Sequence, residues 1–196
     1  MDKPRLRRSS GPRTFNRDKA VETAMRLFRR HGYEGVSIAD LTSAIGIAPP
    51  SLYAAFGSKA GLYREALDRY TALPGAVDGM AGAATLEEAV SGLLEAAVEA
   101  VVAEERGCMI SIGLVEGGPA QQELARELCE RRLALRRRIA DSLSKWMDHE
   151  AANRLAGYLL AVQQGIAVQA RDGADESTLL GIKDEVMAGL AIRRVS

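Results

Sequence analysis

Apolar residues recur every three or four positions along most of the chain, which is the spacing of amphipathic helices and not of strands. The first predicted helix begins after Asn16, a residue type that caps helix N-termini, and ends at Gly32. His31 falls in its last turn, where a cationic side chain is favoured, so we do not expect it to bind a metal. The inward face consists of Ala20, Val21, Ala24, Leu27 and Phe28.

Three short helices are predicted to follow, separated by caps and breaks. Ser37 and Asp40 have the spacing of a short capping box, and Gly46 ends the helix that they begin. Pro49 and Pro50 fit the first turn of the next helix, because the backbone N–H groups there have no partner inside the helix. The predicted ranges are 37–45, 49–56 and 59–71.

The second half of the chain also has a helical pattern. Residues 74–84 are rich in Gly and Ala without a clear period and are predicted to be a linker between domains. The helices beyond it are predicted at 85–105, 108–116, 119–147, 149–171 and 177–193. An aromatic content of 5%, with abundant Ala and Leu, agrees with closely packed helices. The fold is therefore predicted to be all-α, with domains at 16–73 and 85–196.

Charge is unevenly distributed between the two halves. Residues 1–69 hold 13 Lys and Arg against 7 Asp and Glu, whereas residues 70–196 hold 13 against 19. This difference favours a polyanionic partner for the first part only. Residues 1–15 lack apolar periodicity and are predicted to be a flexible basic arm.

Several classes of protein are disfavoured by what the sequence lacks. No apolar run approaches the ~18 residues of a membrane span, and no apolar segment follows the basic N-terminus as in a secretory signal. We therefore expect a cytoplasmic protein without a membrane partner. GxSxG, HExxH, Walker A and GxGxxG motifs are all missing from the sequence, so neither an enzyme nor a bound cofactor is expected.

Two cysteines, Cys108 and Cys129, leave an alternative open. Their spacing matches no metal motif, and reduced, mostly buried thiols are the simplest interpretation. Cys108 follows Arg106 and Gly107 near a predicted helix start, which would lower the pKa of its thiol. Redox sensing, or metal binding by both cysteines with His149, is therefore the alternative function.

The helices at 37–45 and 49–56, joined by a tight turn at Gly46 within a basic region, indicate a helix-turn-helix. In that motif the second helix enters the major groove of DNA. The run SIADLTSAIGIAPPSLYAAFGSKAGLY also resembles the DNA-binding domain of the TetR family of bacterial transcription regulators. The resemblance covers about residues 16–70. It implies that the DNA-facing positions are Ser37, Ala39, Pro49, Pro50, Ser51, Tyr53, Ala54, Ala55 and Lys59.

The DNA-facing positions lack the long polar side chains that usually read bases directly. The second helix offers no Arg, Gln or Asn for bidentate contacts with guanine or adenine. We therefore predict that Ser51, Tyr53 and Lys59 mainly contact the DNA backbone. Thymine methyl contacts, DNA shape and the arginine arm would then supply the specificity.

The resemblance further implies a homodimeric repressor that binds a palindromic operator and is released by a small molecule of unknown identity. The last two helices suit dimerisation, with an apolar stripe at Ala151, Ala152, Leu155, Leu159, Val162 and Ile166 and glycines at Gly157 and Gly165. Candidate effector-binding residues are Leu94, Met109, Ile112, Trp146, Tyr158 and Gln163.

Overall fold

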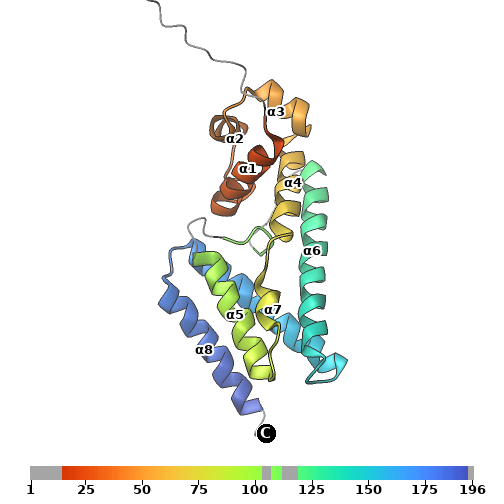
Figure 1. Cartoon of the computed structure of the whole chain (residues 1–196), viewed down its shortest axis with the longest axis vertical. Coiled ribbons are helices and arrows are strands. Elements are labelled where there is room, and N and C mark those ends of the chain that lie inside the picture. The colour runs from red at the N-terminus through yellow and green to blue at the C-terminus, as the bar shows by residue number, and fades with distance from the viewer. Residues whose placement is uncertain (1–14, 103–106, 112–118, 194–196) are drawn as a thin grey trace, which may run out of the picture.

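The computed structural model describes residues 15–102, 107–111 and 119–193, and every regular element in these ranges is a helix (Figure 1). Helices α1 to α4 form one end of the molecule, α5, α7 and α8 form the other, and α6 runs beside both groups. The bounds are α1 Arg17–His31, α2 Ile38–Ile45, α3 Pro49–Phe56, α4 Lys59–Thr71, the 3-10 helix η1 Ala76–Met80, α5 Leu86–Val102, α6 Pro119–Leu143, α7 His149–Arg171 and α8 Glu176–Arg193. The all-α prediction is confirmed.

The first four helices begin where the sequence predicts. The Asn16 side chain accepts a hydrogen bond from the backbone N–H of Lys19. Ser37 and Asp40 form the predicted capping box, and the hydrogen bonds from Ser37 hold the pKa of the Asp40 carboxyl below its usual range. The two prolines occupy the first two positions of α3. Local capping chemistry thus sets these boundaries without help from tertiary packing.

Two hydrophobic cores follow the two ends of the molecule. The first joins α1 to α4 around buried side chains such as Phe28, Leu41 and Leu52, and it also contains Leu124 and Leu128 of α6. The second joins α5, α7 and α8 to the other half of α6. Its buried side chains include Leu93, Leu94, Ile139, Leu143, Leu159 and Ile166. Helix α6 is therefore a rigid element common to both cores.

The segment predicted as a linker, 74–84, contains η1. Val77 and Met80 of this short helix are buried in the second core. A Cβ built on Gly79 would lie 2.2 Å from the carbonyl oxygen of Gly92 in α5, so this crossing requires glycine. The five-residue helix is too short to show a period in the sequence, and its one glycine, Gly79, permits the close approach to α5.

The predicted helix at 108–116 is wrong in the part that the structure describes. Gly107–Ser111 forms a turn, in which Gly107 adopts a φ of 136° and Met109 packs into the first core. Residues 112–116, including Ile112, lie outside the described residues, as do the last residues of the helix predicted to reach residue 105. Helix α6 ends at Leu143, before the predicted end at residue 147. Beyond it, the indole N–H of Trp146 donates to the carbonyl of Ala84, 3.3 Å away.

The apolar stripe predicted for dimerisation lies mostly inside the chain's own core. Ala152, Leu155, Leu159 and Ile166 are all buried in the second core. A helix packed on its own domain buries its most apolar face there, so the stripe could not distinguish that core from a partner. Among the described residues, no helix combines the length and apolar character needed to cross a membrane.

Candidate nucleic-acid interface

Helices α2 and α3 lie at the end of the molecule opposite the C-terminus (Figure 1). Gly46 joins them in the left-handed conformation, with a φ of 78°, and its N–H donates to the carbonyl of Thr42. The Ile47 N–H donates to the same carbonyl, and the Thr42 hydroxyl donates to the carbonyl of Ile38. The turn between the helices is thus fixed by hydrogen bonds among residues that are close in the chain.

The α3 helix presents one apolar face inward and a second face to solvent. Leu52 is completely buried and Phe56 nearly so, which anchors the helix on the first core. The side chain of Tyr53 is 49% exposed on the outer face. The predicted DNA-facing residues that are exposed are Ser37, Ala39, Pro49, Pro50, Ser51, Tyr53 and Ala54.

Ala55 and Lys59 differ from the other predicted positions because both are half-buried. Ala55 packs partly against the first core. The Lys59 Nζ lies 4.2 Å from the ring centroid of Tyr33, and burial lowers the pKa of the Lys59 ammonium group. The structure therefore places Lys59 against an aromatic ring at the start of α4.

A shallow groove between α2 and α3 brings together residues that the sequence separates. Ala39 of α2 and Pro49 of α3 line it together with Ile38, Thr42, Ser43, Gly46 and Ile47. Ser43 is exposed and is not among the DNA-facing positions predicted from the sequence. Its position on the outer face of α2, four residues from Ala39, is the signal that would have identified it.

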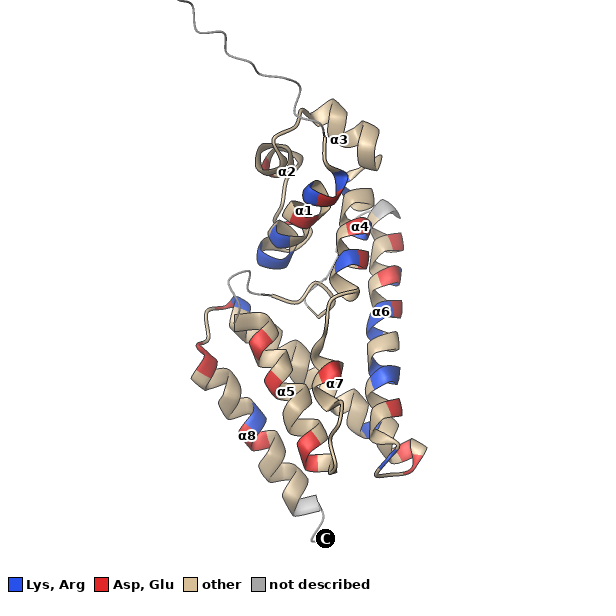
Figure 2. Ribbon diagram, in the orientation of Figure 1, with Lys and Arg blue, Asp and Glu red and all other residues tan. Residues whose placement is uncertain are grey.

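The charge pattern of this end is set by α1 and not by α3. Figure 2 shows that α3 carries neither basic nor acidic residues, whereas both signs occur along α1 and α4. A second hollow, beside the start of α1, is lined by Phe15, Asn16, Lys19 and Thr23 and by the end of α2. Lys19 lies on the polar face of α1 and is also not among the DNA-facing positions predicted from the sequence.

Helix α6, which runs beside both ends of the molecule, is joined to α4 by hydrogen-bonded ion pairs. Arg64 of α4 donates to both Glu123 and Glu127 of α6, and Glu127 raises the pKa of the Arg64 guanidinium. Arg131 of α6 pairs with Asp68 of α4. These ion pairs hold α4, which follows α3 directly, against the half of α6 that packs on the first core.

The family of this chain follows from its similarity to known proteins. The family model for bacterial regulatory proteins of the tetR family matches residues 20–66. The transcriptional repressors ComR and BdcR of Escherichia coli (strain K12) are each 31% identical to the chain over 189 residues. ComR aligns over 90% of both chains, and BdcR over 94% of this chain and 92% of its own. This chain belongs to the TetR family.

Structural similarity agrees with the sequence comparison. A cysteine mutant of the TetR family regulator CifR, solved with 26-bp double-strand operator DNA, is 34% identical and has a TM-score of 0.81. The match covers 91% of this chain and 98% of CifR. The predictions of a TetR-family transcription regulator and of a non-enzymatic role are confirmed by these relatives.

The candidate effector residues that the structure describes in this TetR-family chain are spread over both cores. Leu94 is buried in the second core and Gln163 is buried on α7, whereas Met109 lies in the first core. Trp146 packs at the edge of the second core, near the start of α5. Tyr158 is 46% exposed.

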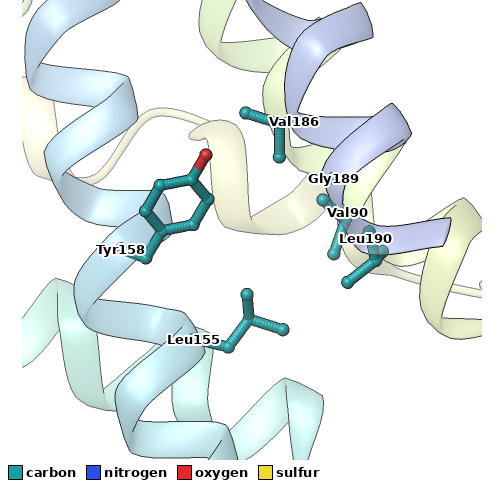
Figure 3. Close-up of a pocket in the computed structure, with 6 residues that line it drawn as sticks. All are labelled: Val90, Leu155, Tyr158, Val186, Gly189 and Leu190. Atoms are coloured by element: carbon teal, nitrogen blue, oxygen red, sulfur yellow. The ribbon is translucent and has the colours of Figure 1, made fainter. Parts of the chain in front are cut away.

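Tyr158 lines a small pocket between α5, α7 and α8. Figure 3 shows Tyr158 and Leu155 of α7 facing Val186 and Leu190 of α8, and Val90 and Gly189 complete the lining. The lining is mostly aliphatic, so the pocket would accept an apolar group.

The two cysteines occupy different environments. Cys129 is exposed, and Cys108 is half-buried, with its sulfur 3.4 Å from the backbone N–H of Ser111. Within the part of the chain that the structure describes, no three His, Cys, Asp or Glu residues are close enough to hold a metal ion.

Proposed function

We propose that this chain is a homodimeric repressor that binds a palindromic operator through α2 and α3 and is released by a small molecule. The observation that carries the DNA-binding proposal is the α3 helix itself. Its inner face is anchored by Leu52 and Phe56, and its outer face is exposed and uncharged. Family membership and the operator complex of CifR support the same proposal.

The side chains on this surface suit backbone contact and shape recognition more than hydrogen bonding to bases. Pro49, Pro50 and Ala54 are short and exposed, so α3 could approach the floor of the major groove closely. Methyl and methylene groups at this distance favour thymine methyls. Tyr53 and Ser51 supply hydroxyl groups for phosphate oxygens.

Replacing Tyr53 by Ala is expected to weaken operator binding by about 1–3 kcal/mol, because a backbone contact is lost from an exposed side chain. We expect the same range for Lys59→Ala. Fluorescence anisotropy with a duplex from the protein's own promoter measures both effects. Lys145→Ala, which removes a lysine just beyond the distant end of α6, is the matched control. Wild-type affinity in both the Tyr53 and Lys59 variants would contradict the assignment of α3.

Dimerisation is supported by the outer faces of α7 and α8. The α8 helix buries Leu179, Val186 and Leu190, and its outer face carries the small exposed residues Gly181 and Ala188 beside Asp184 and Glu185. A Cβ added at Gly165 or Gly181 would meet no described atom within 4 Å, so close packing inside the described chain does not require glycine at either position. They would permit close approach of a second chain.

Gln163 of α7 supports an effector site in the half of the molecule that α5, α7 and α8 form. The residue is 6% exposed, and its Nε2 has no hydrogen-bond partner among the described residues. Leu159, Ile166 and Ala167, one turn away along α7, are all core residues. A buried amide of this kind costs about 1–3 kcal/mol when it is unsatisfied. An effector that carries a hydrogen-bond acceptor on an apolar body would remove this cost.

Substituting Gln163 by Leu should therefore raise the free energy of unfolding by about 1–3 kcal/mol. Chemical denaturation measures this, and Gln164→Leu, at the half-buried neighbouring position, is the control with little expected change. In a thermal-shift screen, acceptor-bearing compounds should stabilise the wild-type protein and leave Gln163→Leu unchanged. A destabilised Gln163→Leu variant would show that the amide already has its partner.

A thiol-reactive effector is the second candidate, favoured by the position of Cys108. Tyr70 of α4 interacts with the Cys108 side chain, and burial is the main cause of the raised pKa of the Tyr70 hydroxyl. Modification of Cys108 would therefore disturb α4 directly. Adding alkylating agents, metal salts or organic compounds while release from DNA is followed distinguishes these effector classes.

A further inference from the structure

The α3 helix lacks a side-chain cap and has no charged residues at its ends. It has eight residues, and no described side chain caps its N-terminus. Its sequence contains no acidic residue in the first turn and no basic residue in the last. Helices of this length are unstable in isolation, so the position of α3 depends on contacts from other elements.

Arg17, the first residue of α1, makes two such contacts with α3 and a third with α4. Its Nη1 donates to the carbonyl oxygen of Ala55 over 2.7 Å, in the last turn of α3. Its Nε donates over 3.0 Å to the Glu65 carboxylate of α4, which its Nη2 also contacts. The guanidinium carbon lies 4.7 Å from the ring centroid of Phe56, one of the two anchors of α3.

Among the described residues, no backbone N–H donates to the Ala55 carbonyl at the end of the helix. The N–H of Gly57 donates to the carbonyl of Tyr53, and the N–H of Ser58 to that of Phe56. A cation at a helix C-terminus is also favoured by the helix dipole. Gly57 ends α3, and Arg17 of α1 adds a hydrogen bond to a carbonyl that this backbone cap leaves free.

We propose that Arg17 is a positioning residue for DNA recognition, which holds α3 at a fixed angle through Ala55, Phe56 and Glu65. The proposal rests on α3 being the recognition helix. A direct phosphate contact is the competing role for an arginine at this place. The paired carboxylate offsets the charge of Arg17, and one N–H of each guanidinium nitrogen is already directed to Ala55 or Glu65 within the protein, which favours the positioning role.

Lysine at position 17 separates the two roles. Arg17→Lys keeps the charge for a phosphate but replaces the planar guanidinium fork, whose separate nitrogens reach Ala55 and Glu65, with a single compact ammonium group. We expect Arg17→Lys and Arg17→Ala each to lower affinity roughly tenfold for a duplex that the wild-type protein selects from a randomised library. Glu65→Gln should lower it roughly threefold, and the double variant Arg17→Ala, Glu65→Gln should match Arg17→Ala.

Three further measurements distinguish a positioning role from a phosphate contact or a general folding defect. The salt dependence of binding and the affinity for unselected DNA should remain unchanged in all variants, because no phosphate contact is lost. In the DNA-free protein, amide hydrogen exchange should accelerate in α3 but not in α5 for Arg17→Lys. Wild-type operator affinity in Arg17→Lys, tighter binding by Glu65→Gln, or a reduced salt dependence in Arg17→Ala would overturn the proposal. A wild-type protein that selects no duplex would overturn the proposed function as well.

Discussion

Truncating Met109 to Ala is expected to lower the free energy of unfolding by about 2–5 kcal/mol and to weaken operator binding as well. Met109 is 1% exposed and lies in the core of α1 to α4, although it follows α5 in the chain. The Tyr63 hydroxyl donates to its carbonyl over 3.4 Å, and Arg29 donates to the nearby Gly107 carbonyl over 3.2 Å. The turn Gly107–Ser111 thus inserts a side chain that follows α5 in the chain into the core of α1 to α4.

Loss of this side chain should loosen the connection between the halves before it unfolds either one. The spacing of two recognition helices in a dimer would then be less well defined, and operator affinity would fall. Met80→Ala is the matched control, because Met80 is similarly buried but lies in the second core. Both variants should have reduced denaturation midpoints, and only Met109→Ala should bind DNA more weakly at a temperature where both are folded. Equal DNA affinity in the two variants would contradict the coupling role of the turn.

The elements that could be predicted from the sequence are those fixed by local chemistry. The capping box at Ser37 and Asp40, the prolines that begin α3 and the glycine that ends α2 specify their boundaries within a few residues. The exposed face of α3 followed from the same periodicity, because Leu52 and Phe56 are one turn apart. For these elements tertiary packing agrees with what the local sequence already specifies.

The features that could not be predicted depend on contacts between distant segments. An apolar Met109 is compatible with either core, and the sequence contains no signal that it packs on Tyr63 instead of beside Leu94. The apolar stripe of α7 could not be assigned to the chain's own core for the same reason. Arg17 could not be recognised as a hydrogen-bond donor to the end of α3, because its acceptor at Ala55 is 38 residues away. Each of these assignments depends on which residues are neighbours in three dimensions, and the residue type alone does not reveal that.

Replacing Val168 by Glu is expected to convert the protein to a monomer and to lower operator affinity at least about a hundredfold. Val168 is 47% exposed on α7, and Ala161 and Gly165 lie on the same side of the helix. In a symmetric dimer formed by this face, the substitution would bury two carboxylates close to the two-fold axis. A monomer contacts one half-site at a time and loses the gain in effective concentration that comes from joining two recognition helices.

Leu133→Glu is the matched control for this prediction. Leu133 is 45% exposed on α6, so the same carboxylate is introduced at an equally exposed apolar position. Sedimentation velocity should find Leu133→Glu dimeric with wild-type DNA affinity, and Val168→Glu monomeric with an unchanged helix content. If Val168→Glu remained dimeric, the interface would lie on another face, and the open glycines of α7 and α8 would not mark a contact between chains. If both variants became monomeric, α6 would belong to the interface, and the helix that joins the two cores would also be the element that joins the two chains.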